Sequence, residues 1–436
     1  MIEITPETIQ EEILKRKDEI VEWIKSLVRF PSENRFPFGN EWEAQKFIEK
    51  ECANIGLKTD VFSPEEIPNI KDDPSWLSGR DYSGNRKNVI ARWIGRGKGN
   101  TLLFSGHVDV APFEPDNWKV CRPYEPVEIE GKLYGRGTVD MKGGLAAAYW
   151  AIRILKEAGF TPQGDVIFES VVDEEFAGGN GTLASRLKGY NADLAILTEP
   201  TRMQICSACL GAFLGDLVIK GKAGMPFMGY SIPNPVDGAA RAIELFKEWE
   251  KYRRSINNHE LFNEPGKELN VVLWDIGSKV PGEFTQMGNP LLIKVSWIVW
   301  SYPGMSEEYF YNKFREFWEN HFKNDPVLRS FELEITTAFH YVKPWESDLN
   351  DKGIQKLIEV YRKYTKIDPV VSGASLSCDM AIYGDQGKMP VIILGPGGDN
   401  LRCSDEWVLL EDIYSLTGMF ALMINDWCQV IHEINS

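Results

Sequence analysis

Short apolar runs alternate with longer segments of helical periodicity through much of the chain. The runs at residues 101–104, 165–172 and 193–197 are rich in Val, Ile, Leu and Phe. Continuous runs of this length are typical of strands buried on both faces of a parallel sheet. Apolar residues at helical spacing predict helices over residues 7–28 and 142–158. This alternation of strands and helices indicates an α/β fold.

The pattern changes near residue 211. From there the sequence predicts strands at 213–219, 269–274, 291–300 and 331–335, with helices at 236–254 and 307–322. The order β-α-β-β-α-β is that of a ferredoxin-like α+β domain. We therefore predict a mixed, mostly parallel sheet flanked by helices, formed by residues 1–210 and 339–436. A smaller α+β domain of residues 211–338 is inserted into it.

Composition and charge narrow the functional class. The 436 residues are 43% hydrophobic and 26% charged, ordinary globular values that argue against disorder. A net charge of −16 makes nucleic acid and anionic membranes poor partners. No apolar run reaches the ~18 residues that span a bilayer, and residues 1–8 lack the basic and apolar regions of a signal peptide. Seven scattered cysteines suit a reducing compartment, so we expect a cytoplasmic protein.

Polar residues follow the three apolar runs where each predicted strand ends. Residues 105–109 (Ser-Gly-His-Val-Asp) follow the first, residues 173–175 (Asp-Glu-Glu) follow the second, and Glu199 follows the third. A further acid, Asp140, lies in the glycine-rich segment 133–144. Side chains at the carboxyl ends of parallel strands meet in one crevice. One imidazole and several carboxylates there predict a divalent metal site, with Zn²⁺ or Mn²⁺ expected.

The motifs resemble, in order and spacing, a known enzyme family. The order His-x-Asp, Gly-Arg-Gly-x-x-Asp-Met-Lys-Gly-Gly, Asp-Glu-Glu and Glu-Pro-Thr is similar to that of the zinc hydrolases that include acetylornithine deacetylase, succinyl-diaminopimelate desuccinylase, aminoacylase and glutamate carboxypeptidase. The resemblance continues at residues 373–379, 393–397 and 405–406, and so covers almost the whole chain. It implies a zinc peptidase-like catalytic domain, a small-molecule substrate, and a homodimer formed through the inserted lid domain.

The resemblance also implies the metal ligands. His107 and Glu199 would bind one ion, Asp140 would bridge two ions, and Glu175 would bind the second. The ion would be Zn²⁺, with Mn²⁺ or Co²⁺ as alternatives. A bridging carboxylate can hold two cations about 3.5–4 Å apart.

Two further acids would serve the chemistry without being ligands. The resemblance implies that Glu174 is the general base, and a carboxylate beside a ligand can move the proton of an activated water. Asp109 lies two residues after His107, on the same face of an extended segment. It is suited to accept the second ring N–H of that histidine, fixing its tautomer.

The second metal site departs from the family pattern. The family supplies a last metal-binding histidine shortly before Asp-Glu, whereas residues 398–404 are one residue short and contain none. Counting from Gly397 places Cys403 at that position, and counting back from Glu406 places Arg402 there. Cys403 could bind zinc as a thiolate, whereas Arg402 could replace the second cation's charge with its own. The sequence therefore leaves open whether the site binds one metal ion or two.

The inserted domain departs as well. Met225 stands where the family has a histidine that stabilises the oxyanion, and a thioether has no proton to donate. Trp300 stands where the family has an arginine that holds a substrate carboxylate. We predict that Met225, Trp300 and Arg402 contact the substrate, and that the substrate is apolar or aromatic.

Together these features predict a metal-dependent hydrolase of an amide-like C–N bond. Water activated at His107, Asp140 and Glu199 would attack the substrate, with Glu174 as the base. The alternative is a degenerate family member that binds a ligand or partner, or uses the site for another reaction. An enzyme needs a bound metal and a working Glu174, whereas a pure binding protein needs neither.

Overall fold

The structure is a computed structural model of the 436-residue chain. It describes residues 4–113, 117–176, 178–225, 231–278, 288–337 and 341–432. The chain forms two compact units. Unit 1 comprises Met1–Ala208, Glu346–Ala374 and Cys378–Ser436, and unit 2 comprises Cys209–Trp345 and Ser375–Ser377. The predicted domain boundary at residue 339 lies outside the described residues.

The sheet of unit 1 places the three predicted strands side by side. Its strands run in the order β17 (Val391–Ile393), β10 (Leu194–Leu197), β5 (Leu102–His107), β9 (Val166–Val171), β4 (Asn88–Trp93) and β3 (Lys58–Phe62). The first four are parallel, and β4 and β3 continue the sheet antiparallel. Every residue of β5 and β9 is buried, as expected for strands covered on both faces. The predicted fold class, a mixed and partly parallel sheet with flanking helices, is confirmed.

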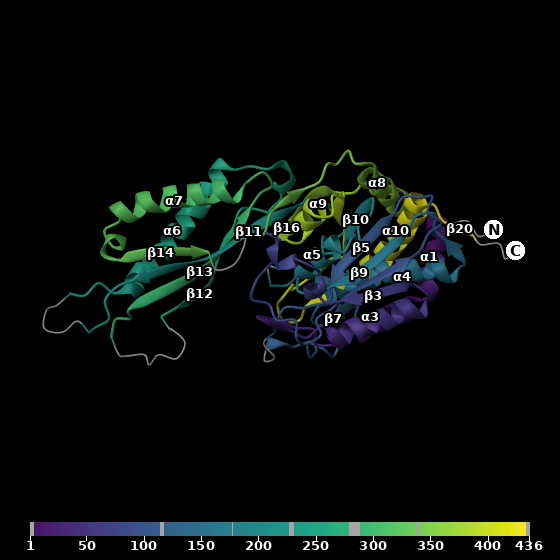
Figure 1. The fold of residues 1–436 in the computed structure, drawn as a ribbon, viewed down its shortest axis with the longest axis horizontal. Coiled ribbons are helices and arrows are strands. Elements are labelled where there is room, and N and C mark those ends of the chain that lie inside the picture. Colours follow the sequence, from purple (N-terminus) through teal and green to yellow (C-terminus); the bar gives the residue numbers. More distant parts are fainter. Residues whose placement is uncertain are drawn as a thin grey trace. The chain divides into compact units, whose positions relative to one another are not determined.

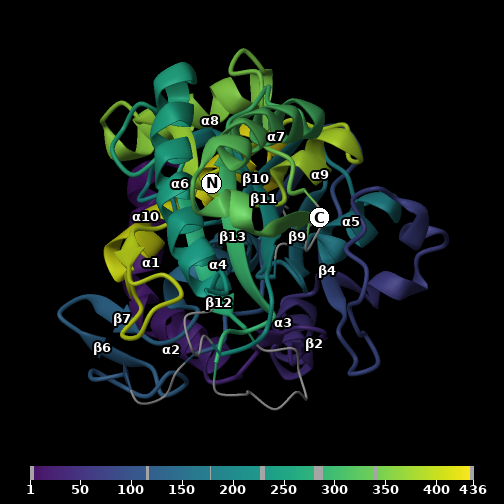
Figure 2. The same cartoon turned by 90° about the vertical axis from the view of Figure 1, so that its left-hand side faces the viewer.

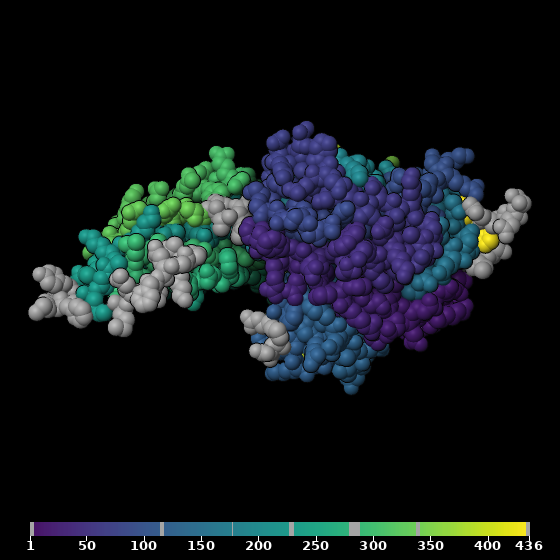
Figure 3. Space-filling model, turned by 60° about the horizontal axis from the view of Figure 1, so that its bottom comes forward, coloured from purple at the N-terminus to yellow at the C-terminus, as the bar shows by residue number. Residues whose placement is uncertain are grey.

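Helices cover this sheet (Figure 1). The helices α4 (Gly143–Glu157) and α10 (Leu410–Cys428) pack against each other, and α10 also packs against α8 (Lys352–Thr365). Unit 1 also contains the helices α3 (Trp42–Asn54), α5 (Asn180–Leu187) and α9 (Met380–Asp385). Figure 3 shows that the N-terminal part of the chain, in purple, covers one face of unit 1.

The single helix predicted over residues 7–28 is wrong in one respect. The structure has two helices, α1 (Pro6–Lys15) and α2 (Lys17–Val28), separated by Arg16. The backbone of Arg16 is not helical (φ −115°, ψ 10°), and its side chain pairs with Glu12 and Glu157. Both helices still bury their apolar residues, including Ile13 and Ile24. The periodicity was therefore a sound guide to the buried face but not to the break.

A four-stranded antiparallel sheet lies beside the main one. Its order is β18 (Gly398–Asp399), β19 (Trp407–Leu409), β7 (Lys132–Tyr134) and β6 (Val127–Ile129). The loop between β18 and β19 carries the residues that stand in place of the family's last histidine. The short elements β1 (Asn34–Arg35), β2 (Phe38–Gly39), β8 (Phe160–Thr161), β15 (Trp345–Glu346), β16 (Val371–Ser377) and β20 (Ile431–His432) complete the strands.

Unit 2 has the β-α-β-β-α-β order. Its strands β12 (Val271–Gly277), β13 (Leu292–Ser301), β11 (Ile205–Lys220) and β14 (Glu332–Thr337) form an antiparallel sheet in that spatial order. The helices α6 (Pro235–Ile256) and α7 (Glu307–Asn324) lie on one face of it (Figures 1 and 2). The helices and the sheet share an aromatic core that includes Trp249, Trp297 and Trp318. Among the helices of the described residues, none is long and apolar enough to cross a membrane.

Candidate metal centre

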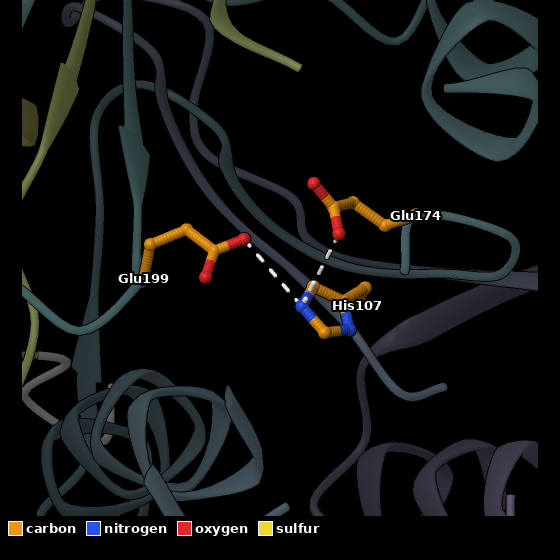
Figure 4. A group of neighbouring side chains, drawn as sticks. All are labelled: His107, Glu174 and Glu199. Carbon is orange, nitrogen blue, oxygen red and sulfur yellow. Dashed lines mark ion pairs between the residues drawn. The ribbon is translucent and has the colours of Figure 1, made fainter. Parts of the chain in front are cut away.

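The strand β5 ends at His107, and three carboxylates converge on its ring. His107 Nε2 lies 3.2 Å from Asp140 Oδ1, 3.5 Å from Glu199 Oε1 and 3.7 Å from Glu174 Oε2. Figure 4 shows the carboxylates of Glu174 and Glu199 directed toward the same ring nitrogen of His107. The ring is 1% exposed and the three carboxylates no more than 11%. Buried carboxylates repel one another unless a cation lies among them.

The protonation equilibria of these groups reflect that crowding. Burial, opposed by His107 and assisted by Asp140, raises the pKa of Glu199 to about 8. Burial also raises the pKa of Glu174 well above its usual range. Burial by itself would lower the pKa of His107, but the surrounding carboxylates, Glu199 foremost, raise it overall. A metal ion bound among these side chains would therefore displace protons from them.

Two sets of three side chains have the geometry of a metal site. One set is His107, Glu174 and Glu199, and the other is His107, Asp140 and Glu175. Within each set the possible ligand atoms lie within 4.8 Å of one another. Imidazole nitrogen with carboxylate oxygen is a donor set that zinc accepts, and Mn²⁺ and Co²⁺ share part of that preference. The first set therefore fits a divalent ion by position, chemistry and charge.

Asp140 is fixed by the turn Thr138–Lys142, which enters α4. The N–H groups of Val139 and Asp140 donate to Glu406 Oε1, and Arg136 pairs with the other oxygen of Glu406 at 2.8 Å. Gly137 precedes the turn at φ +79°, where a Cβ would overlap Val110. The glycine-rich motif thus provides the backbone that aims Asp140 at His107.

Asp109 orients the site differently from the prediction. His107 Nδ1 lies 2.8 Å from the backbone carbonyl of Asp109, but 3.7 Å from its carboxylate. The carboxylate oxygen Oδ2 instead accepts the N–H groups of Glu174 and Glu175, both at 3.0 Å, and the side chain of Asn34 at 2.7 Å. The predicted imidazole–carboxylate bond is therefore wrong. A carbonyl holds the ring, and the carboxylate holds the two glutamates.

A buried cluster behind Glu174 was not predicted. Asp173 is fully buried in the left-handed region, at φ 71°. Its carboxylate accepts from Arg80 Nε at 2.7 Å, from Tyr82 at 2.5 Å and from Arg86 at 2.9 Å. All three partners come from the irregular segment 63–87, whose sequence has no periodicity to suggest that role. Arg80 and Arg86 lie 93 and 87 residues before Asp173 in the chain, so the spacing of the residues gives no sign of these contacts.

The position of the missing histidine is filled by Arg402. Its Nη2 lies 2.5 Å from Glu175 Oε2, and its Nε lies 3.8 Å from Asp140 Oδ2. Cys403 is exposed and belongs to neither metal-binding set. Arg402, the residue obtained by counting back from Glu406, is thus the one that faces Glu175 and Asp140.

A small pocket adjoins the first set of ligands. It is lined by His107, Glu174, Glu199, Thr182, Asp379 and Tyr383, among others. Its free volume is about 10 Å³, the space of about one water molecule. Thr182 donates to Asp379 at 2.6 Å, and burial raises the pKa of Asp379 to about 7. The sequence resemblance reached residue 379 but assigned it no role.

The two predicted lid residues belong to unit 2. Met225 is 38% exposed, and Trp300 lies on β13, partly buried. Trp297, on the opposite face of the strand, is fully buried in the core of unit 2. The predicted substrate contacts of Met225 and Trp300 stay predictions.

Comparison with known proteins agrees with these features. Residues 103–426 match the model of peptidase family M20/M25/M40. The chain is 26% identical to an N-formyl-4-amino-5-aminomethyl-2-methylpyrimidine deformylase of Halalkalibacterium halodurans, over 95% of this chain and 96% of the relative. It is 30% identical to a probable succinyl-diaminopimelate desuccinylase of Staphylococcus aureus, over 78% and 87%. The crystal structure of human carnosine dipeptidase 1 is similar in fold, with a TM-score of 0.72 at 15% identity, over 97% and 100%. The chain belongs to peptidase family M20/M25/M40.

Proposed function

We propose that this protein is a metal-dependent hydrolase that removes a small acyl group, such as formyl, from a neutral aromatic amine. The observation that carries the proposal is the convergence of Asp140, Glu174 and Glu199 on His107 Nε2. A divalent ion bound there would supply Lewis acidity to a water molecule and to the substrate carbonyl. An imidazole with three buried carboxylates is suited to that task and is a poor choice for a simple binding surface.

Glu174 is the proposed proton carrier. Its Oε2 lies beside His107 while its backbone is held by Asp109, so the carboxylate has a fixed position. Among the described residues its ion-pair partner is His107 alone. It takes the proton of the attacking water and delivers it to the leaving nitrogen as the C–N bond breaks. The products are a carboxylic acid and an amine. Burial, which raises the pKa of this group, favours its holding the proton between the two steps.

The comparison with known proteins supports the substrate class. The two relatives named as deformylases of an aminomethylpyrimidine align with 95% and 97% of this chain. We propose that Met225 and Trp300 contact the aromatic part, because ring and thioether contacts favour uncharged partners.

A panel of substrates tests this proposal. The zinc-loaded protein is incubated with an N-formyl aminomethylpyrimidine, N-formylbenzylamine, N-acetylornithine and N-succinyl-diaminopimelate, and release of the free amine is measured. We expect the two formyl compounds to be hydrolysed and the two charged amino acids to be poor substrates. Efficient release from N-succinyl-diaminopimelate with none from the formyl compounds would refute the substrate class while leaving amide hydrolysis intact.

We further propose Zn²⁺ as the ion, with Mn²⁺ or Co²⁺ as substitutes, a homodimer formed through unit 2, and a cytoplasmic location. The location rests on the seven cysteines, most of them buried. The dimer rests on the family resemblance. Light scattering at micromolar protein concentration tests it, and a monomer would contradict it.

A further inference from the structure

The second set of metal-binding side chains already contains a positive charge. Two of its three members, Glu175 and Asp140, face the guanidinium of Arg402, at 2.5 Å and 3.8 Å. The Glu175 side chain is 2% exposed. Its Oε1 accepts the N–H of Ala111 at 2.9 Å, and its Oε2 has the ionic contact with Arg402. Among the described residues the ion pair of this buried carboxylate is with Arg402, a cation that is part of the protein.

Contacts of the loop between β18 and β19 hold Arg402 next to the second set of metal-binding side chains. Arg402 has φ 58°, in the left-handed region that non-glycine residues avoid. Its carbonyl accepts from Arg136 Nη2 at 3.2 Å, and Arg136 is held by the buried Glu406. Because Glu406 also holds the backbone of Asp140, one buried ion pair fixes both Asp140 and the arginine that faces it. Strained residues held in this way are concentrated at functional sites.

Charge and geometry together exclude a tightly bound ion from the second set. A metal ion there would need the carboxylate oxygens that Arg402 contacts, and it would lie next to a guanidinium that cannot be deprotonated in a protein. Two cations so close together repel strongly when little solvent separates them. In the part of the chain that the structure describes, Glu174 and Glu199 of the first set form ion pairs with His107 alone.

We propose that Arg402 acts as a built-in second cation. The centre then holds one metal ion, bound by His107 and Glu199 with Glu174 beside it, and the guanidinium takes the place of another ion at Glu175 and Asp140. This inference rests on the proposed metal-dependent function. Arg402 is half-exposed, so the guanidinium can neutralise the buried carboxylates while part of it stays open toward a ligand.

The number of metal ions bound per chain tests the inference independently of enzyme activity. The wild type, Arg402→Ala and Arg402→His are saturated with Zn²⁺, dialysed and analysed by mass spectrometry. We expect about one ion per chain for the wild type and about two for Arg402→His, because imidazole is a good zinc ligand. Arg402→Ala should bind its second ion at least about tenfold more tightly than the wild type does, since the repulsion is gone. Adding Glu175→Gln to either variant should return it to about one ion, because a ligand of the second set is lost.

Arg202→Ala is the matched control. Arg202 is exposed and pairs with Asp399 of β18 at 3.8 Å, so this variant removes an arginine near the same loop without touching the metal-binding sets. Its metal content should equal that of the wild type. If Arg202→Ala gained a second ion as Arg402→Ala does, net charge rather than the position of Arg402 would be responsible, and the inference would fall.

A wild-type measurement covers the case in which the Arg402 variants do not fold. Paramagnetic resonance of the Mn²⁺-loaded wild type should show the spectrum of isolated ions at every loading. A spin-coupled pair, or two tightly held zinc ions in the wild type, would overturn the inference but leave the proposed hydrolase standing. A wild type that holds no ion at all would instead defeat the proposed function.

Discussion

Replacing Asp109 tests whether its carboxylate holds the two glutamates or the histidine ring. The oxygen Oδ2 accepts three buried hydrogen bonds, from Asn34 and from the N–H groups of Glu174 and Glu175. Each hydrogen bond to a charged group contributes about 1.5–3 kcal/mol. Because the three share one oxygen, we expect Asp109→Ala to lower the free energy of unfolding by about 3–6 kcal/mol. Asp109→Asn, which keeps an acceptor but loses the charge, should cost about 1–3 kcal/mol.

The two possible roles of the Asp109 carboxylate, holding the glutamates or holding the histidine ring, predict different zinc affinities for the variant. The His107 ring is held by the backbone carbonyl at 2.8 Å, which Asp109→Asn leaves in place, so zinc affinity should stay within about threefold of the wild type. The shifted Glu174 should instead lower kcat by about 10²-fold, since displacement of a reacting group by about 1 Å has effects of that size. Zinc titration, kcat at saturating zinc and thermal unfolding are measured together, with Asp193→Asn, an exposed acceptor for Thr101, as the control. A 10–100-fold loss of zinc affinity with unchanged kcat would refute this reasoning.

Three further predictions follow from named contacts. Arg80→Met leaves the buried carboxylate of Asp173 short of a partner, so thermal or urea unfolding should show a loss of about 3–5 kcal/mol; a change below 1 kcal/mol would contradict this. Removing the metal with a chelator should lower the unfolding temperature, because an ion present at 100 times its Kd contributes about 2.7 kcal/mol; an unchanged temperature would count against a bound ion. Trp300→Arg should raise KM for aromatic formyl amides, and an unaltered KM would remove Trp300 from the proposed substrate contacts.

The sequence was sufficient to predict the sheet and the convergence of side chains at its edge. Apolar runs mark the parallel strands because such strands are buried on both faces, and chain order then places His107 and Glu199 at neighbouring strand ends. The break at Arg16 could not be predicted, because the apolar spacing of α1 and α2 is continuous across it. The break depends on one non-helical residue whose partner, Glu157, lies far along the chain.

The contacts that support the metal-binding side chains were also hard to predict, because several of them join residues that lie far apart in the chain. The cluster around Asp173 joins segments about 90 residues apart in the chain, and buried arginines carry no periodic signal. The choice between Arg402 and Cys403 depended on the path of one loop, and a one-residue deletion leaves two alignments equally good. The role of Asp109 depended on whether its backbone or its carboxylate faced the ring, a difference that residue spacing alone does not resolve.

The substitution Glu174→Gln tests the central claim most directly, with metal content and turnover of a formyl amide measured on the same sample. Glutamine keeps the size of the side chain and the backbone N–H that donates to Asp109, but it cannot carry the proton. The account predicts that turnover falls by at least about 10²-fold while the variant retains close to the metal content of the wild type. A variant that hydrolyses the substrate as fast as the wild type would contradict the proposed mechanism.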